Sequence, residues 1–372
     1  MDPQPLVFNR NNPVTVSVER VHGRPQGARS AVAKTLSPNG QVIVPHWTAG
    51  TDDRHWNLWN RELLAYSSGL TDSFSDVGLR GPRLLDTVQW PDDSVELLLE
   101  DVAGRSGGEL TLEDHRRINH KLGRAQASAM VTLGDESIPS GQRAWTSVPW
   151  LSKNWIRQYA STRLNRPTVY ADKSLWEHPV VVEGFGADRH VIRQGFGELY
   201  ASANKWFDLL EALPQTLCHL DFWPNNAIAA SDGTDVLIDW AFVGWGAVGE
   251  DPGNWIPDSV FDHFVEPEEI DALESTVWDA YRMGLESHGL DGLAVELARL
   301  GLCSSAVKYI WLPGMMVMNA DHVGPTAYGS REGYPLHVVF ARRAPMLLRL
   351  LERIDEAERL LVELRGDLSW LP

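Results

Sequence analysis

Three polar residues of the stretch Cys218–Asp239 have the types and the spacing that phosphoryl transfer requires. Asp221 and Asn226 lie five positions apart in the run HLDFWPNN, and Asp239 ends the hydrophobic run Val236–Ile238. A carboxylate such as Asp221 can accept the proton of an attacking hydroxyl. An amide and a second carboxylate, here Asn226 and Asp239, can hold the Mg²⁺ that bridges the phosphates of a nucleotide. The spacing therefore predicts metal-dependent phosphoryl transfer.

A hairpin is needed to bring Asp239 back to the loop that carries the other two residues. Ser231–Gly233 is a turn signal between two short hydrophobic pieces, Ala227–Ala229 and Val236–Ile238. We therefore expect these pieces to pair as antiparallel strands.

HLDFWPNN followed by LIDW resembles the catalytic segment of the aminoglycoside phosphotransferase and choline kinase group, which has the protein-kinase-like fold. The alternative interpretation, a buried His219 with two surface acids at a turn, explains neither the paired spacing nor the aromatic Trp240 after the second acid. By this resemblance Asp221 is the catalytic residue, and Asn226 and Asp239 are the metal ligands.

The resemblance implies an α+β, bilobal protein-kinase-like fold with a small, β-rich N-terminal lobe and a larger, mainly helical C-terminal lobe. We expect residues 1–101 to form the nucleotide-binding lobe and 102–372 the catalytic and acceptor lobe. Residues 139–190, rich in Pro, Gly and Trp, are interpreted as an insertion that forms a wall of the acceptor site.

The resemblance also implies a Lys–Glu pair that holds the phosphates of ATP. Val14–His22 alternates apolar and polar residues, which predicts a strand, and Ser30–Leu36 is a second strand that carries Lys34. An amphipathic helix is predicted from about Arg54 to Gly69, with Glu62 in its middle. Lys34 and Glu62 match the pair.

The nucleotide loop departs from the family pattern. If Val14–His22 is the strand just before the lysine strand, the loop is Asn9–Asn12, which has no glycine. If the loop is instead Gly23–Gly27, too little chain is left for the intervening strand. The position of this loop stays open.

A second hairpin is predicted from Leu84–Leu85, a turn at Trp90–Asp93 and the strand Val95–Val102. The resemblance places the hinge at its end, where backbone around Glu100 and Val102 would bind the adenine. Because backbone groups would recognise the base, the sequence says little about which nucleotide binds. ATP is the preferred prediction, and GTP remains an alternative.

Residues near the incoming hydroxyl are candidates for acceptor binding. They are Trp223 in the catalytic loop and the acids Glu250, Asp251 and Asp258 in the segment after Asp239. Tryptophans of residues 139–190 are stacking candidates, although tryptophan is more often core; they are Trp145, Trp150, Trp155 and Trp176.

Other elements are predicted from hydrophobic periodicity and capping signals. The predicted helices are Thr111–Thr132, Gly197–Leu213 and Leu336–Leu364, the last interrupted at Pro345. The glycine-rich segment Trp240–Trp255 is predicted to be irregular.

The net charge of −17 disfavours a nucleic-acid partner, because phosphate backbones are bound by clustered Lys and Arg. No Lys or Arg occurs between Lys205 and Arg282, a region that contains the catalytic segment and many acids. This gap predicts either a negative site that attracts cationic ligands and Mg²⁺, or merely a solvated acidic face.

Two cysteines, an N-terminus without a secretory signal pattern, and no window expected to span a membrane all favour a cytoplasmic protein without a membrane partner.

These observations predict an ATP- and Mg²⁺-dependent O-phosphotransferase that acts on a small hydroxylated molecule, such as a cationic or sugar- or nucleoside-containing antibiotic. A metabolic kinase for choline, an amino sugar or homoserine would use the same residues. A nucleotide-binding pseudokinase is the third hypothesis, favoured by the missing glycine loop and disfavoured by the intact Asp221, Asn226 and Asp239. The sequence leaves open the acceptor, the hydroxyl and the oligomeric state.

Overall fold

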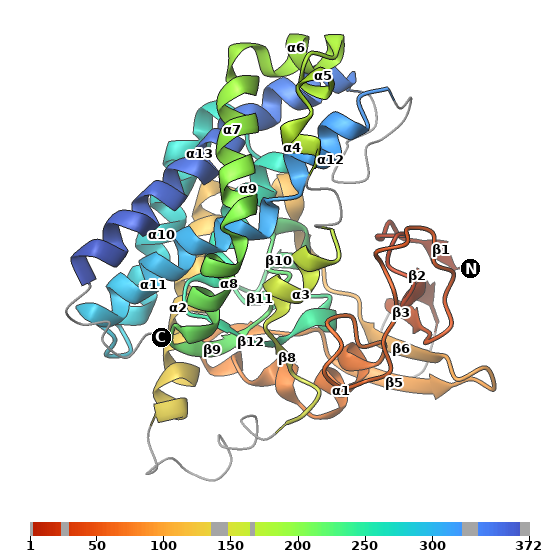
Figure 1. Ribbon diagram of the computed structural model, residues 1–372. Coiled ribbons are helices and arrows are strands. Elements are labelled where there is room, and N and C mark those ends of the chain that lie inside the picture. The colour runs from red at the N-terminus through yellow and green to blue at the C-terminus, as the bar shows by residue number, and fades with distance from the viewer. Residues whose placement is uncertain (1–2, 24–29, 135–147, 164–167, 322–333, 365–372) are drawn as a thin grey trace.

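The computed structural model describes residues 3–23, 30–134, 148–163, 168–321 and 334–364. An antiparallel sheet forms the N-terminal part, and most of the chain after it is helical (Figure 1). This is the α+β kinase-like architecture that the sequence predicted.

The N-terminal sheet has five antiparallel strands in the order β1-β2-β3-β6-β5. Their bounds are Gln4–Pro5 for β1, Thr15–His22 for β2, Ser30–Leu36 for β3, Leu84–Gln89 for β5 and Val95–Glu100 for β6. The two predicted hairpin strands and the two strands around Lys34 are therefore present. Lys34 lies on β3 opposite Leu97 of β6, in the middle of the sheet.

Helix α1 (Arg61–Ser67) is shorter than the predicted helix, which began near Arg54. The backbone carbonyls of His55 and Trp56 accept hydrogen bonds from the side chain of Arg61. Residues 54–60 therefore form turns, and Trp56 packs beside the helix rather than on it.

Two small sheets support the catalytic segment. One has the order β4-β11-β10-β7 and the other β8-β12-β9. The bounds are Leu79–Arg80 for β4, Gly104–Arg105 for β7, Ser152–Lys153 for β8, Gln215–Cys218 for β9, Ala227–Ala230 for β10, Asp235–Leu237 for β11 and Gly244–Ala247 for β12. The predicted hairpin after Asn226 is confirmed as β10–β11, with Gly233 in the left-handed region at its turn (φ 83°).

The helices surround these sheets (Figure 1). Their bounds are Leu112–Gly134 for α2, Trp155–Ser161 for α3, Thr168–Ala171 for α4, Lys173–Trp176 for α5, Pro179–Phe185 for α6, Arg189–Ala201 for α7, Ala203–Ala212 for α8, Glu250–Phe261 for α9, Ile270–Glu286 for α10, Leu293–Ser304 for α11, Leu312–Met318 for α12 and Leu336–Glu363 for α13.

Helices α2 and α10 pack closely because glycines face each other where they meet. A Cβ atom on Gly123 would lie 2.2 Å from the carbonyl oxygen of Tyr281, and one on Gly284 would lie 2.3 Å from that of His120. Real Cβ contacts are never so short, so only glycine fits at either position.

Several element predictions were wrong in detail. The predicted helix Gly197–Leu213 is two helices, α7 and α8, with a break at Ser202, whose hydroxyl bonds back to the carbonyl of Glu198. Helix α13 runs through Pro345 without a break, since it is packed against α6 and α11.

The segment predicted to be irregular after Asp239 contains strand β12 and helix α9. Its glycine and proline residues led to the wrong prediction. Pro252 stands in the first turn of α9, where a missing N–H costs nothing. Gly253 allows close packing, because a Cβ there would lie 2.1 Å from the Ser305 hydroxyl.

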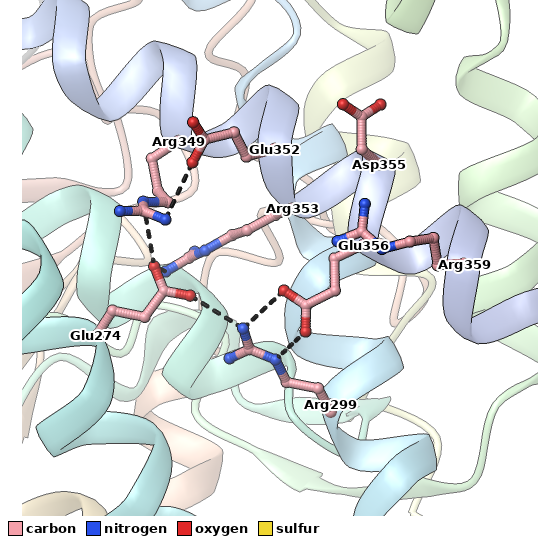
Figure 2. Close-up of a pocket in the computed structure, with 8 residues that line it drawn as sticks. All are labelled: Glu274, Arg299, Arg349, Glu352, Arg353, Asp355, Glu356 and Arg359. Carbon is pink, nitrogen blue, oxygen red and sulfur yellow. Dashed lines mark hydrogen bonds and ion pairs between the residues drawn. The ribbon is translucent and has the colours of Figure 1, made fainter.

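Many of the acids of the basic-free region pair with basic residues from other parts of the chain. Asp208 and Glu211 pair with Arg157, Asp258 pairs with Lys308, and Glu266 pairs with Arg342. Asp271 and Glu274 of α10 pair with arginines of α11 and α13, and Figure 2 shows the pairs of Glu274. Basic residues from elsewhere in the chain therefore compensate part of the negative charge in this region.

A cavity of about 300 Å³ is lined by Glu274 of α10, Arg299 of α11 and six charged residues of α13 (Figure 2). Arg299 pairs with both Glu274 and Glu356, and Arg353, which is only 1% exposed, lies 3.3 Å from Glu274. Six of the eight charged residues that line the cavity pair with one another, so we interpret it as a packing feature of the helices and not as a ligand site.

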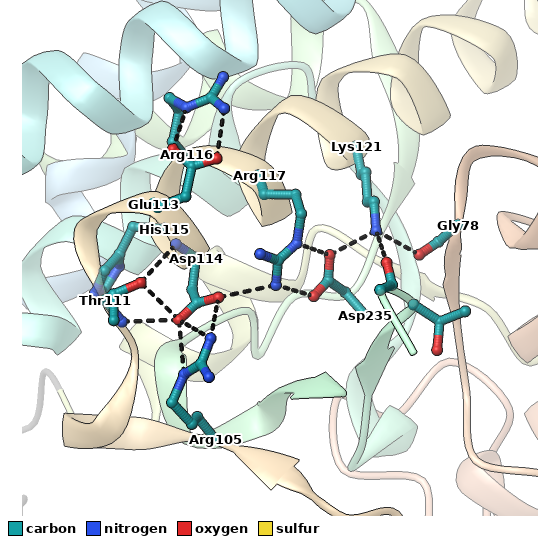
Figure 3. Close-up of polar contacts among 12 residues, drawn as sticks. Gly78, Arg105, Thr111, Glu113, Asp114, His115, Arg116, Arg117, Lys121 and Asp235 are labelled. Atoms are coloured by element: carbon teal, nitrogen blue, oxygen red, sulfur yellow. Dashed lines mark hydrogen bonds and ion pairs between the residues drawn. The ribbon is translucent and has the colours of Figure 1, made fainter. Parts of the chain in front are cut away.

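Helix α2 is tied to the hairpin β10–β11 by a second set of ion pairs (Figure 3). Asp235 is fully buried and receives hydrogen bonds from Arg117 and Lys121 of α2. Asp114, at the start of the same helix, is held by Arg105 and caps the helix through Thr111. These ion pairs fix the hairpin that precedes Asp239 to helix α2.

The segment Leu293–Met318 is long and apolar enough to cross a membrane by length and composition, which the sequence prediction had overlooked. Its apolar window is 94% buried inside the structure, as expected for a core segment.

Candidate active site

The hairpin β10–β11 brings Asn226 and Asp239 together. Ala227 pairs with Leu237 at its open end, and the N–H of Ile238 donates to the carbonyl of Asn226 at 2.9 Å. Asn226 stands just before the first of these strands, and Asp239 lies two residues after the end of the second. The two predicted metal ligands thus leave the same end of one hairpin.

The loop between β9 and β10 is held in an unusual conformation. Leu220, just before Asp221, has φ 65°, in the left-handed region that a branched residue rarely enters. The carboxylate of Asp251 accepts the N–H groups of His219 and Leu220, both at 2.9 Å. Strain of this kind persists only where surrounding bonds enforce it, so Asp251 fixes the direction in which Asp221 points.

His219 supports the loop from the other side. Its Nε2 donates to the carbonyl of Ile238 at 3.0 Å, and its ring meets Trp240 edge-on. Burial lowers the pKa of His219 to about 4, so the ring is neutral at neutral pH. The geometry is that of a brace between the two parts of the catalytic segment.

Asp221 receives a hydrogen bond from Asn226 and carries a perturbed pKa. The Asn226 amide nitrogen donates to the Asp221 side chain at 2.8 Å and to its carbonyl at 3.0 Å. Burial, reinforced by the charge of Asp239, raises the pKa of Asp221 to about 7. A carboxylate with such a pKa is suited to take up a proton near neutral pH.

Asp239 also lies in the left-handed region (φ 61°), and its side chain is 40% exposed. Lys34 Nζ lies 2.9 Å from its carboxylate and 2.6 Å from that of Glu62. Burial lowers the pKa of Lys34, but Asp239 and Glu62 outweigh this effect and raise it above its ordinary value. The structure thus brings together Lys34, Glu62 and Asp239, which are far apart in the sequence. We call this ion-pair cluster of three residues the relay.

The residues present fit a magnesium ion with nucleotide phosphates. The NH₂ group of Asn226 donates a hydrogen bond to Asp221. The amide oxygen of Asn226 and the exposed carboxylate of Asp239 therefore remain as possible metal ligands. Among the described residues no group of three or more His, Cys, Asp or Glu could hold a metal. Mg²⁺ needs no such group, because it is commonly bound by one or two protein ligands together with phosphates and water.

The hinge candidates lie at the end of β6. The Glu100 side chain pairs with Arg80 and Arg83, and its N–H donates to the Arg83 carbonyl. This N–H is therefore not available for adenine. Val102 follows in a stretch without regular structure, and its role in binding adenine stays a prediction.

The strand order places a loop at one of the two positions that the sequence left open for the phosphate loop. Asn9–Asn12 connects β1 to β2, the two strands before the lysine strand, and carries a turn at Arg10–Asn11. Asn12 is buried and accepts a hydrogen bond from Asn57. Most of the alternative, Gly23–Gly27, lies outside the described residues.

The acceptor candidates differ in their placement. Glu250 and Asp251 are buried, and their carboxylates accept backbone N–H groups, from Ala247 in the case of Glu250. The prediction that Glu250 and Asp251 bind an acceptor does not fit these hydrogen bonds to the backbone. Asp258 is buried beside Lys308, and Trp223 is half-buried and stacks on Phe264. The role of these two stays a prediction.

The tryptophans proposed for stacking are mostly core. Trp155 and Trp176 are 2% and 1% exposed, and Trp150 packs against the same core. Trp145 lies outside the described residues.

Sequence reasoning missed two supports of the site, Asp251 as a brace and Lys308 beside Asp258. Lys308 is buried, and its charge acts on Asp221, whose pKa it lowers against the larger effect of burial. The basic-free gap of the sequence drew attention to the acids alone. A lysine within the apolar run Leu302–Met318 was a signal for a buried partner.

We expect Asp251→Asn to slow phosphoryl transfer at least about tenfold per folded molecule. An asparagine would turn an N–H group toward one of the donors that Asp251 now accepts, which leaves the catalytic loop short of a bond worth about 1–3 kcal/mol. Turnover and thermal unfolding, measured on the same sample, test this.

The matched control is Asp114→Asn, because Asp114 is equally buried and caps α2 away from the loop. It should lower the unfolding temperature with little effect on turnover. Equal turnover in both variants would show that Asp251 serves stability alone.

The model of the phosphotransferase enzyme family matches residues 69–283, more than half of the chain. The match includes Asp221, Asn226 and Asp239, whereas Lys34 and Glu62 precede it. The fold and this match define a kinase that phosphorylates small molecules. The chain belongs to the phosphotransferase enzyme family.

Solved structures of the same architecture share little sequence with it. An aminoglycoside phosphotransferase from Alicyclobacillus acidocaldarius is 13% identical, with 99% of this chain and 93% of that chain covered and a TM-score of 0.50. An amicoumacin kinase, in complex with AMP-PNP, Ca²⁺ and Ami, is 12% identical, with coverages of 95% and 88% and a TM-score of 0.50. A choline kinase from Cryptosporidium parvum is 10% identical, with coverages of 100% and 93% and a TM-score of 0.49. No curated protein sequence matches the chain.

Proposed function

We propose that this kinase transfers the γ-phosphate of ATP, with Mg²⁺, to a hydroxyl group of a small molecule. The observation that carries the proposal is the convergence of Lys34, Glu62 and Asp239 in one ion-pair relay, with Asp239 acting electrostatically on Asp221. In the proposal, the positively charged Lys34 and the carboxylate of Asp239, as a metal ligand, would neutralise the charge of the phosphates.

In the proposed reaction Asp221 accepts the proton of the acceptor hydroxyl while the hydroxyl oxygen bonds to the γ-phosphorus. The bond between that phosphorus and the bridging oxygen breaks, and ADP leaves. Asn226 and Asp239 would hold the metal, which neutralises charge on the phosphates when bound. Lys34, held by Glu62, would contact the phosphates.

The acceptor is proposed to be a cationic antibiotic or one that contains a sugar or nucleoside, which phosphorylation would inactivate. One buried carboxyl group supports a cationic group on the acceptor. Burial and the charge of Asp258 raise the pKa of Asp262 to about 7, against the opposing effects of Arg343 and Lys308. Within the described residues, Oδ1 of Asp262 lacks a hydrogen-bond donor. An amine on the acceptor could supply one.

A metabolic kinase for choline, an amino sugar or homoserine is the second candidate, because it would use the same relay. The pseudokinase hypothesis would require a site that binds nucleotide without turnover, whereas the complete set of Asp221, Asn226 and Asp239 favours catalysis. A cytoplasmic location, without membrane or nucleic-acid partners, stays part of the proposal.

The test is a screen of aminoglycosides, peptide and nucleoside antibiotics, choline, amino sugars and homoserine with ATP or GTP and Mg²⁺, read as nucleoside diphosphate released and as product mass increased by one phosphate. We expect one acceptor class to be phosphorylated with ATP. Binding of Mg·AMP-PNP in calorimetry without turnover on any acceptor would favour the pseudokinase. Failure to bind any nucleotide would contradict the proposal.

A further inference from the structure

Arg61, the residue before Glu62, is fully buried and donates hydrogen bonds to backbone carbonyls only, among the partners that the structure describes. Nε donates to Trp150 at 2.8 Å, and Nη2 donates to His55 at 2.7 Å. Nη1 donates to Trp56 at 2.9 Å and to Ala241 at 3.2 Å. One guanidinium therefore joins three stretches of chain, around residues 55, 150 and 241.

Burying a charged guanidinium is costly, because the group loses its contacts with water. The four carbonyl groups must compensate for this loss. Burial lowers the pKa of Arg61 to about 9, against a smaller opposing effect of Asp53. A buried cation without a bonded carboxylate is tolerated only where other dipoles are well placed to solvate it. The planar fork of arginine can reach carbonyls in several directions at once, which an ammonium group on a flexible stem cannot do.

The stretches that Arg61 joins are those that carry the phosphate-binding relay. Arg61 belongs to helix α1, as does Glu62, the partner of Lys34. Ala241 follows Asp239 by two residues in the short 3₁₀ turn Trp240–Phe242, which packs against α1. The stacking of Trp56 on Phe242, with ring centroids 5.9 Å apart, reinforces the same contact.

We propose that Arg61 is a positioning residue that sets the distance between the Lys34–Glu62 pair and Asp239. Without it, helix α1 and the turn after Asp239 would be held together mainly by packing and by Lys34, and the lysine and the Asp239 carboxylate would lose their fixed spacing. The residue touches no substrate; it acts through the backbone on either side of the site. This role rests on the proposed function, since the relay is taken to bind Mg·ATP.

The first experiment compares Arg61→Lys with Arg353→Lys. Both replace an arginine that is almost completely buried, but Arg353 lies in the charged cavity between α10 and α13, away from the relay. Calorimetry with Mg·AMP-PNP and the Mg²⁺ dependence of turnover are measured on each folded variant. We expect Arg61→Lys to weaken Mg·AMP-PNP binding and to raise the Mg²⁺ requirement by about tenfold or more, because at least one charged hydrogen bond is lost. Arg353→Lys should leave both within about twofold of the wild type, because the described partners of Arg353, Glu274 and the carbonyl of Gly253, are not part of the relay.

The second experiment needs no variant and therefore holds even if Arg61→Lys does not fold. Amide hydrogen exchange of the wild-type protein is followed in α1 and in residues 240–243, with increasing denaturant. If Arg61 couples these elements, their amides should open in one cooperative step, and Mg·AMP-PNP should slow both sets by the same factor.

Two results would overturn the proposal. One is an Arg61→Lys variant with wild-type affinity for Mg·AMP-PNP and wild-type Mg²⁺ dependence. The other is separate opening of α1 and residues 240–243 in the wild type. Failure of the proposed function looks different, because then the wild type itself would either not bind Mg·AMP-PNP or bind it without phosphorylating any acceptor, while the exchange experiment would still report on the coupling.

Discussion

Asp221→Ala is expected to abolish ATP-dependent phosphorylation, with turnover reduced by about 10²–10⁴-fold, while the fold stays intact. The carboxylate is the group within the catalytic loop that can accept the hydroxyl proton, and its pKa, raised to about 7 by burial and by Asp239, suits that task. Asp221→Asn should have an effect of the same size, because it keeps the shape of the side chain and removes only the base. Single-turnover phosphorylation of the accepted substrate measures the loss.

Nucleotide binding provides the contrast for Asp221. Both variants should bind Mg·AMP-PNP within a few-fold of the wild type, since Asp221 is not a proposed metal ligand. Asp232→Asn, in the turn of the same hairpin, changes an exposed aspartate that bonds only to Thr234 among its described partners and should leave turnover unchanged. Normal turnover by Asp221→Ala would refute the assignment of the base.

Asp239→Asn is expected to lower turnover at least about a hundredfold and to remove most of the Mg²⁺-dependent affinity for nucleotide. The charge of a metal ligand contributes several kcal/mol to stabilising the transferred phosphoryl group, and each 1.36 kcal/mol is a factor of ten. The substitution also removes one of the two carboxylates that hold Lys34. Calorimetry with AMP-PNP across a series of Mg²⁺ concentrations tests the effect on binding.

Asparagine is the informative replacement because it tolerates the left-handed backbone at this position better than other residues do. Asp93→Asn is the matched control: Asp93 has φ 66° and lies exposed in the turn between β5 and β6. It should bind and turn over nucleotide like the wild type. If Asp239→Asn retains a wild-type Mg²⁺ response, Asp239 is not the metal ligand.

The sequence predicted the parts of this protein that depend on local chemistry. The strand around Lys34 and the hairpin after Asn226 are encoded by alternation and by a turn, which are short-range signals. The family resemblance then connected Lys34 to Glu62, a contact between elements that no local pattern specifies.

What the sequence did not reveal depends on partners that are distant along the chain. Asp251 was taken for an acceptor ligand, because nothing in its neighbourhood indicates that its carboxylate binds the N–H groups of His219 and Leu220. The start of α1 was placed too early, because the carbonyls that would have extended the helix are bound by Arg61 instead. The acid-rich region was predicted to be either a negative site or a solvated acidic face, and no local pattern indicated that arginines from distant helices pair with many of its members.

The hydrogen bonds of Arg61 have a consequence for how the protein unfolds. A helix of seven residues is too short to persist alone in water, and this one depends on carbonyls supplied by residues 150 and 241. The first hundred residues, excised from the rest, should therefore lose α1 and with it the partner of Lys34. The two parts that look like separable modules along the sequence would then melt in a single transition.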